Sequence, residues 1–128
     1  LERARAGVYP ESSLRDLPRE FVNGAFQRMG GMYSVRSEFR EGIDFALQDI
    51  RKAMPHGCFH TILCRNCVLT YYDEALQQQV MEKIVERLLP GGFLIVGKGE
   101  PLPKGLTNLA IYEKRLGIHR KQKHSEHA

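Results

Sequence analysis

The chain has 128 residues, of which 42% are hydrophobic and 27% charged, and its formal net charge is +4. This length suits one domain with a buried core, and the near-average composition excludes wholesale disorder. Apolar runs such as residues 93–96 are too short to cross a membrane, and no basic-then-apolar leader opens the chain. Because the sequence starts at Leu1 in a charged, helix-like stretch, we expect it to be part of a longer polypeptide.

The first third of the chain reads as short elements separated by glycines. Residues 1–6 resemble the end of a helix that closes at Gly7. Residues 19–29 show a weak helical pattern, which the pair Gly30-Gly31 ends. Residues 32–40 mix aromatic, β-branched and charged side chains, a composition that favours an exposed strand or ribbon.

The middle of the chain predicts a strand, a second strand and a long helix. Apolar and polar residues alternate over 43–48, which predicts a strand that ends at Asp49-Ile50. Residues 59–64 form a more continuously apolar strand. Asp73 is placed to cap a helix over 74–89, whose apolar residues recur at steps of three and four.

The last third completes an α/β pattern. Pro90-Gly91-Gly92 ends the helix, and residues 93–96 form another strand. Residues 109–112 and 116–119 are predicted to pair as a terminal antiparallel hairpin. Strand, helix and strand in succession indicate two parallel strands joined by a crossover, and hence the α/β class.

Ligands of such sheets bind beyond the carboxyl ends of the strands, and this rule selects three places: 49–50, 65–66 and 97–100. The Asp49 carboxylate suits a ribose hydroxyl or an adenine amino group, the Arg65 guanidinium a carboxylate, and Asn66 can donate or accept. Together they fit a ligand that carries both a nucleoside and an acid. The simpler alternatives are a turn-forming Asp49 and a surface ion pair for Arg65. Residues 97–99 lack the third glycine and the helix of a dinucleotide fingerprint.

Other patterns predict no metal and no nucleic acid. The spacing Cys64-x-x-Cys67, with Cys58, His56 and His60 nearby, is superficially that of a zinc site. However, side chains of a strand point to alternating faces, so we expect these groups not to converge, and we expect no metal. An odd number of cysteines suits a reducing compartment. Residues 121–128 are predicted to be a flexible basic tail. Its basic residues are not interleaved with aromatic side chains that could stack on bases, so the tail gives no support for nucleic-acid binding.

Several motifs closely resemble the CheR family of S-adenosylmethionine-dependent methyltransferases, which esterify receptor glutamates in bacterial chemotaxis. They are residues 59–66 (Phe-His-Thr-Ile-Leu-Cys-Arg-Asn), 71–74 (Tyr-Tyr-Asp-Glu), 88–94 (Leu-Leu-Pro-Gly-Gly-Phe-Leu) and 97–100 (Gly-Lys-Gly-Glu). Upstream, residues 4–9 are similar to a helix of the family, and residues 35–50 to a small β-subdomain that leads into the third sheet strand.

The resemblance implies that residues 1–120 are the C-terminal part of the catalytic domain, with a small inserted β-subdomain at about 20–42. The fold is then the C-terminal half of a Rossmann-like class I methyltransferase sheet. The family's glycine-rich cofactor loop and its ribose-binding acid would lie outside residues 1–128, so we expect this part alone to be inactive.

The resemblance also implies roles for individual residues toward S-adenosyl-L-methionine. Asp49 and Ile50 would frame the adenine, and Arg65 and Asn66 would lie along the cofactor, with Arg65 also orienting the substrate carboxylate. Tyr71 matches a tyrosine that lines the methyl-transfer site.

This sequence departs from the family pattern at four places. Asp49 stands where an asparagine is usual, His60 replaces an aspartate, and Lys98-Gly99 replaces a His-Ser pair. Cys67 adds one residue, so that Thr70 is an alternative to Tyr71 at the tyrosine position. Apart from the change at Asp49, these departures bear on the methyl acceptor more than on the cofactor.

The favoured function is therefore methyl transfer to glutamate side chains of a chemoreceptor-like protein in the cytoplasm. The alternatives are a relative directed at a small molecule or another protein, and a non-catalytic domain that keeps the fold. We expect no membrane insertion, and self-association of the chain through exposed sheet edges.

Overall fold

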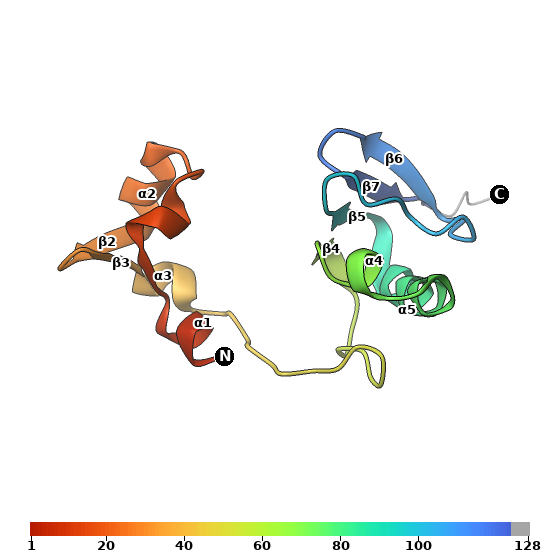
Figure 1. Cartoon of the computed structure of the whole chain (residues 1–128), viewed down its shortest axis with the longest axis horizontal. Helices are drawn as coiled ribbons and strands as arrows, with labels where there is room; N and C mark the ends of the chain where they lie inside the picture. The colour runs from red at the N-terminus through yellow and green to blue at the C-terminus, as the bar shows by residue number, and fades with distance from the viewer. Residues whose placement is uncertain (124–128) are drawn as a thin grey trace. The chain divides into compact units, whose positions relative to one another are not determined.

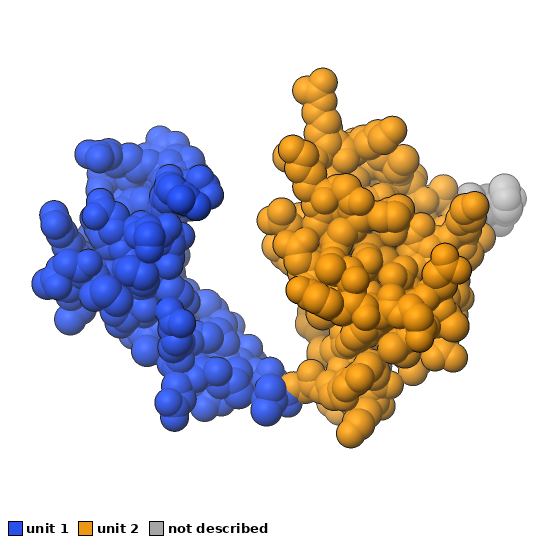
Figure 2. Space-filling view, viewed as in Figure 1, with its two compact units in different colours: residues 1–47 blue, residues 48–128 orange. Residues whose placement is uncertain are grey.

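A computed structural model describes residues 1–123. The chain divides into two compact units, residues 1–47 and the part from Gln48 onward, which Figure 2 colours blue and orange. Each unit combines helices with a sheet, which confirms the mixed α/β class. In the described part of the chain, no helix is long and apolar enough to cross a membrane.

Unit 1 contains a three-stranded antiparallel sheet with the order β1-β3-β2. Figure 1 shows β2 beside β3. Its elements are α1 (Glu2–Ala6), β1 (Val8–Pro10), the 3-10 helix η1 (Glu11–Leu14), α2 (Arg19–Ala25), β2 (Phe26–Met29), β3 (Met32–Val35) and α3 (Ser37–Arg40). Gly30 and Gly31, with φ values of 51° and 86°, form the two-residue turn between β2 and β3. The predicted helix over 19–29 therefore ends early, because its last residues pair with β3.

The strand predicted over residues 43–48 is wrong, because this segment lies outside both sheets. Leu47 is 90% exposed and Ile43 51% exposed. Alternation provides the side-chain pattern of a strand, but a strand also needs a hydrogen-bonded neighbour. Among residues 1–123, none pairs with this segment.

Unit 2 has a four-stranded mixed sheet with the order β4-β5-β7-β6. Its elements are β4 (Phe59–Cys64), α4 (Val68–Tyr71), α5 (Glu74–Glu86), β5 (Leu88–Val96), β6 (Leu109–Glu113) and β7 (Ile118–Lys121). β4 and β5 pair in parallel across the crossover that contains α5, which confirms the strand–helix–strand prediction. The last two strands pair antiparallel with each other, and β7 also pairs with β5.

Helix α5 anchors the core of unit 2. The Asp73 carboxylate accepts a hydrogen bond of 2.9 Å from the Leu76 backbone N–H, as predicted for a helix cap. The helix ends three residues earlier than predicted, because Leu88 and Leu89 belong to β5. The buried residues of the core come from α4, α5, β4, β5 and the loop before β4: Met54, Cys64, Val68, Val80, Met81, Ile84, Val85, Leu88, Leu94 and Val96.

The predicted tail begins inside the sheet. Lys121 is the last residue of β7, and its Nζ donates hydrogen bonds to the carbonyl oxygens of Val85 (2.8 Å) and Leu88 (2.7 Å). It therefore ties the sheet to the carboxyl end of α5. Residues 124–128, which hold the rest of the predicted tail, lie outside the described residues.

The outer edge of β4 predicts self-association. Among residues 1–123, β4 pairs only with β5, and Leu63 on β4 is 68% exposed. An apolar edge strand without charges is a template for pairing with a second copy. We expect residues 1–128 to form dimers or larger species at high concentration, and Leu63→Lys to shift them to monomers in multi-angle light scattering.

Ile111→Lys provides the matched control, because Ile111 is 66% exposed on β6 at the opposite edge of the sheet. If Ile111→Lys converts the chain to monomers and Leu63→Lys does not, the strand that pairs with a second copy is not β4. A wild-type chain that stays monomeric throughout the concentration series contradicts the prediction altogether.

Candidate functional site

The carboxyl ends of β4 and β5 meet, as the parallel pairing requires. Cys64, the last residue of β4, is in register with Val96, the last residue of β5. The residues that follow them, 65–66 and 97–100, therefore lie at the same edge of the sheet. Two of the three places selected from the sequence are thus brought together.

Glu100 connects these two strand ends. Its Oε2 accepts hydrogen bonds from the backbone N–H of Gly97 at 2.5 Å and from that of Asn66 at 3.3 Å. Its Oε1 accepts a hydrogen bond from the hydroxyl of Thr70, on helix α4. One carboxylate therefore joins the end of β4, helix α4 and the end of β5.

The backbone is tight where the two strand ends meet. Asn66 has a φ of 51°, a left-handed conformation that only asparagine, aspartate and glycine adopt readily. A Cβ atom on Gly97 would meet the Glu100 Oε2 atom first and would lie 2.7 Å from both the Glu100 carboxyl carbon and the Asn66 Oδ1 atom, closer than real Cβ atoms come to such neighbours. The close approach of the Glu100 and Asn66 side chains therefore favours glycine at position 97.

The Glu100 carboxyl favours its charged form. Partial burial raises its pKa, but hydrogen bonds from Thr70, Gly97 and Asn66 and the charge of Arg65 outweigh burial. The net result is a pKa below the ordinary value, so Glu100 is ionised at neutral pH. The strand ends therefore hold a fixed negative charge beside the Arg65 guanidinium.

The Asp49 carboxylate is bound by Arg51, two residues further along the chain. Its Oδ1 accepts hydrogen bonds from the Arg51 backbone N–H (3.0 Å) and Nε (2.9 Å), and its Oδ2 lies 2.8 Å from the Arg51 Nη2. These contacts lower the pKa of Asp49 from 3.8 to about 2. The predicted cofactor acceptor is thus the partner of a bidentate ion pair two residues away.

Ile50 and Arg65 line one pocket of about 420 Å³ in unit 2, together with Met54, Ile62 and Cys64. Asp49 and Asn66 are not part of its lining. The structure therefore brings Ile50 together with Arg65, and joins Asn66 instead to Gly97 and Glu100.

Tyr71 and Thr70 lie differently, although they are neighbours on α4. The Tyr71 side chain is 78% exposed, whereas the Thr70 hydroxyl is bound to Glu100. The roles of Thr70 and Glu100 at the strand ends were not predicted. The position of Glu100 in the 97–100 loop was the available signal, but its contacts join residues 30 and 34 positions apart.

The cysteines and histidines of residues 1–123 do not gather into one site. Cys64 is buried, whereas Cys58 and Cys67 are exposed, and all three are free thiols. Burial raises the pKa of the Cys64 thiol, which keeps it protonated. Within residues 1–123, no group of three histidine, cysteine or acidic side chains is placed to hold a metal ion.

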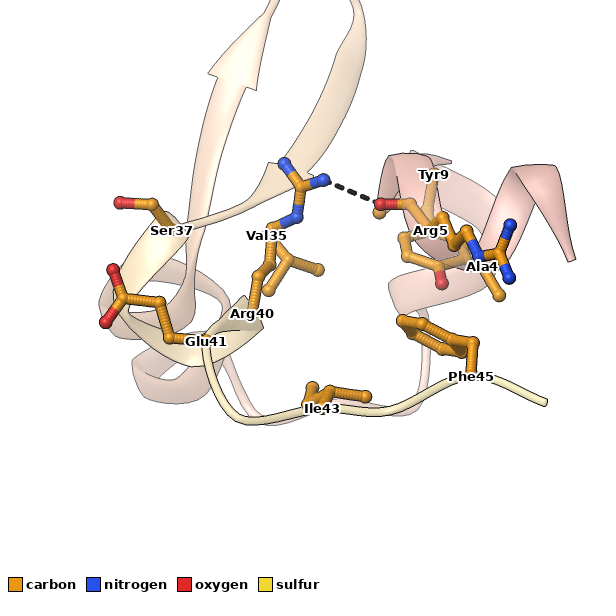
Figure 3. A pocket seen from close by; sticks show the side chains of 10 residues that line it. Ala4, Arg5, Tyr9, Val35, Ser37, Arg40, Glu41, Ile43 and Phe45 are labelled. Atoms are coloured by element: carbon orange, nitrogen blue, oxygen red, sulfur yellow. Dashed lines mark hydrogen bonds between the residues drawn. The ribbon is translucent and has the colours of Figure 1, made fainter.

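Unit 1 has a pocket of its own, of about 440 Å³ (Figure 3). Helix α1, helix α3 and the segment after α3 contribute to its lining, with Ile43 and Phe45 on one side. The Arg40 Nη2 donates a hydrogen bond of 2.6 Å to the carbonyl oxygen of Arg5, which ties α3 to α1. This pocket contains none of the site residues predicted from the sequence.

The sequence matches the family described as CheR methyltransferase, SAM binding domain, over residues 1–117. It is 33% identical over 106 residues to the chemotaxis protein methyltransferase of Escherichia coli K12, and 35% identical over 108 residues to that of Klebsiella aerogenes. Each match covers 78% of this chain, and 37% and 36% of the two proteins.

A third relative is an uncharacterized 104.1 kDa protein of Rhodobacter capsulatus, 29% identical over 118 residues. That match covers 92% of this chain and 12% of the relative. The chain thus spans little more than a third of the chemotaxis methyltransferases it matches, and a smaller share of the third protein. The matched domain has S-adenosylmethionine as its cofactor.

The ion pair of Asp49 leads to a prediction about its titration. We expect the Asp49 carboxyl to titrate with a pKa of about 2 in carbon-detected NMR, and Arg51→Ala to raise that pKa toward 3.8. Because the folded-state pKa is lowered, the pair stabilises the fold above pH 3.8, and this contribution is lost as the pH falls toward 2.

Lys52→Ala serves as the control, since Lys52 lowers the pKa of Asp49 least of the groups around it. An Asp49 that titrates near 3.8 in the wild-type chain shows that the bidentate pair does not persist in solution.

Proposed function

The chain belongs to the CheR methyltransferase family, and we propose that its strand ends hold part of S-adenosylmethionine for methyl transfer to a glutamate side chain of a protein. The observation that carries this proposal is the meeting of residues 65–66 with residues 97–100 at the ends of two parallel strands. This is the place where α/β sheets bind nucleoside-containing ligands.

The residues present suit different parts of the cofactor. Ile50 offers an apolar contact for the adenine, in the same pocket as Arg65. The Asp49 carboxylate has about four lone-pair sites and keeps acceptor capacity beside its pair with Arg51. The Asn66 side chain provides both a donor and an acceptor. When bound, S-adenosylmethionine supplies an activated methyl group.

The methyl acceptor is a carboxylate in this proposal. A glutamate side chain is ionised at neutral pH, so it needs no general base to become a nucleophile. The exposed Arg65 guanidinium can hold it in a bidentate fork, and catalysis then consists of positioning and exclusion of water. The ring of Tyr71 on α4 is exposed, and we assign it to contact with the incoming acceptor protein.

The names of the relatives support the choice of partner and compartment. Two of the three relatives described above are chemotaxis protein methyltransferases, and we take a chemoreceptor-like protein with acidic side chains as the substrate of this chain. Three free thiols suit the reducing cytoplasm, where we place the reaction.

A polypeptide of residues 1–128 is expected to bind S-adenosylmethionine with a millimolar dissociation constant. The family resemblance puts the glycine-rich loop and the ribose acid outside these residues. Each missing hydrogen bond weakens binding by about 1–3 kcal/mol, roughly five- to 150-fold. Isothermal titration calorimetry measures the constant, and micromolar affinity would mean that residues 1–128 already hold the whole cofactor.

Arg65 is the residue whose substitution tests the reaction. In a polypeptide that contains these residues and transfers methyl groups, Arg65→Ala should lower kcat/KM by about 100-fold or more, because a lost charged hydrogen-bond pair costs about 3 kcal/mol. Arg65→Lys should restore only part of the activity, since a point charge cannot form the fork. Melting temperatures should change by no more than about 2 °C, because the residue is exposed.

Arg115→Ala is the matched control, since Arg115 is an exposed arginine in the loop between β6 and β7. Unchanged turnover in Arg65→Ala removes Arg65 from the site. A large loss of stability in that variant would make its role structural.

A further inference from the structure

Glu100 makes contacts that a surface loop does not need. The loop of residues 97–100 is already closed by its own backbone, because the Glu100 N–H donates to the Gly97 carbonyl oxygen at 3.1 Å. The bond from the Gly97 N–H to the Glu100 side chain closes it a second time. The contacts with Asn66 and Thr70 are additional, and they reach 34 and 30 residues along the chain.

The contact with Asn66 helps to select one of the conformations open to this residue. Asparagine adopts a left-handed φ such as 51° more readily than most residues, and the hydrogen bond from its N–H favours that choice here. The Glu100 carboxylate accepts the Asn66 N–H, while the Asn66 Oδ1 lies close against Gly97. The direction of the Asn66 side chain therefore depends on the position of Glu100.

The hydrogen bond from Thr70 holds the Glu100 carboxylate from a second element, helix α4. Thr70 lies on α4, whose Val68 is fully buried in the core of unit 2. Because α4 is anchored in this way, the Thr70 hydroxyl gives the Glu100 carboxylate a fixed partner outside the 97–100 loop. The carboxylate is thus held from two sides, and in turn holds Asn66.

We propose that Glu100 is a positioning residue, which holds the Arg65-Asn66 turn and the Gly97 loop in the arrangement that meets the cofactor. This inference rests on the proposed function, because it assumes that S-adenosylmethionine lies at these strand ends. Glu100 acts through the Asn66 backbone and through the charge it places beside Arg65. It is not a catalytic residue, since its two oxygens are already occupied by protein donors.

The experiment follows backbone amides and cofactor binding in the same NMR samples of the 128-residue chain. We expect Glu100→Ala to speed hydrogen exchange at the Gly97 amide about tenfold. We expect it also to raise the dissociation constant of S-adenosylmethionine about tenfold, in a titration that extends to tens of millimolar. Glu100→Gln keeps an oxygen for the N–H groups and should restore most of both effects, to within about threefold of wild type.

Two further variants test the same role with the Glu100 side chain left in place. Thr70→Val leaves the carboxylate in place but removes one of its partners, and should weaken cofactor binding about two- to fivefold. Glu113→Ala is the matched control, because Glu113 accepts a hydrogen bond from the Arg115 N–H in the hairpin of β6 and β7. It should leave the Gly97 exchange rate and the cofactor affinity unchanged.

The outcomes separate the two proposals. If S-adenosylmethionine shifts the wild-type amides of residues 65, 66 and 97 and shifts those of Glu100→Ala equally at every concentration, Glu100 is not a positioning residue and the proposed function stands. Faster Gly97 exchange with unchanged affinity also overturns the positioning role, because Glu100 is then structural only. If the wild-type amides do not respond at all, the proposed function fails, and this inference fails with it.

Discussion

The parallel pairing of β4 with β5 is the constraint on which the candidate site depends. The register that sets Cys64 opposite Val96 places the residues after each strand at one edge, although they lie far apart in the sequence. The packing of the crossover helix α5 on the sheet fixes that register, because the buried residues of α5 share one core with Leu94 and Val96 of β5. A shift of β5 by one residue would turn these side chains away from the helix and would carry Gly97 away from Asn66. The core and the site are therefore specified by the same contacts.

The parts of the fold that could be predicted are those whose signals are local. The cap at Asp73 and the apolar stripe of α5 lie within one helix, and β4 is a short apolar run of its own. The strand predicted over residues 43–48 failed because pairing is not local: its alternation is real, but no described neighbour completes it. The end of α5 was misplaced for a related reason, since Leu88 continues the helical spacing and belongs instead to the sheet.

The candidate site, like the fold, could be predicted only in part from the sequence. The rule that ligands lie beyond strand ends needs only the order of the elements. Of the three places that it selected, residues 65–66 and 97–100 are neighbours in the structure, whereas no strand directly precedes residues 49–50. What each side chain does there depends on which partner reaches it. Asp49 was predicted to accept hydrogen bonds from the cofactor, but Arg51 two residues later already uses part of its acceptor capacity. Glu100 gains its importance from Asn66 and Thr70. Composition and spacing contain no information about such choices among partners.

Thr70 and Tyr71 are neighbours on α4 that meet different surroundings. Successive residues of a helix point about 100° apart, so two neighbours cannot both face Glu100. Thr70 takes that direction, and Tyr71 is left with a ring that is 78% exposed. In the proposed function the two positions then have different tasks. Thr70 holds the carboxylate that fixes the cofactor side, and Tyr71 meets the incoming protein, for which an amphipathic ring is well suited. Replacing Tyr71 should accordingly affect acceptor binding more than cofactor binding, whereas the order should be reversed at Thr70.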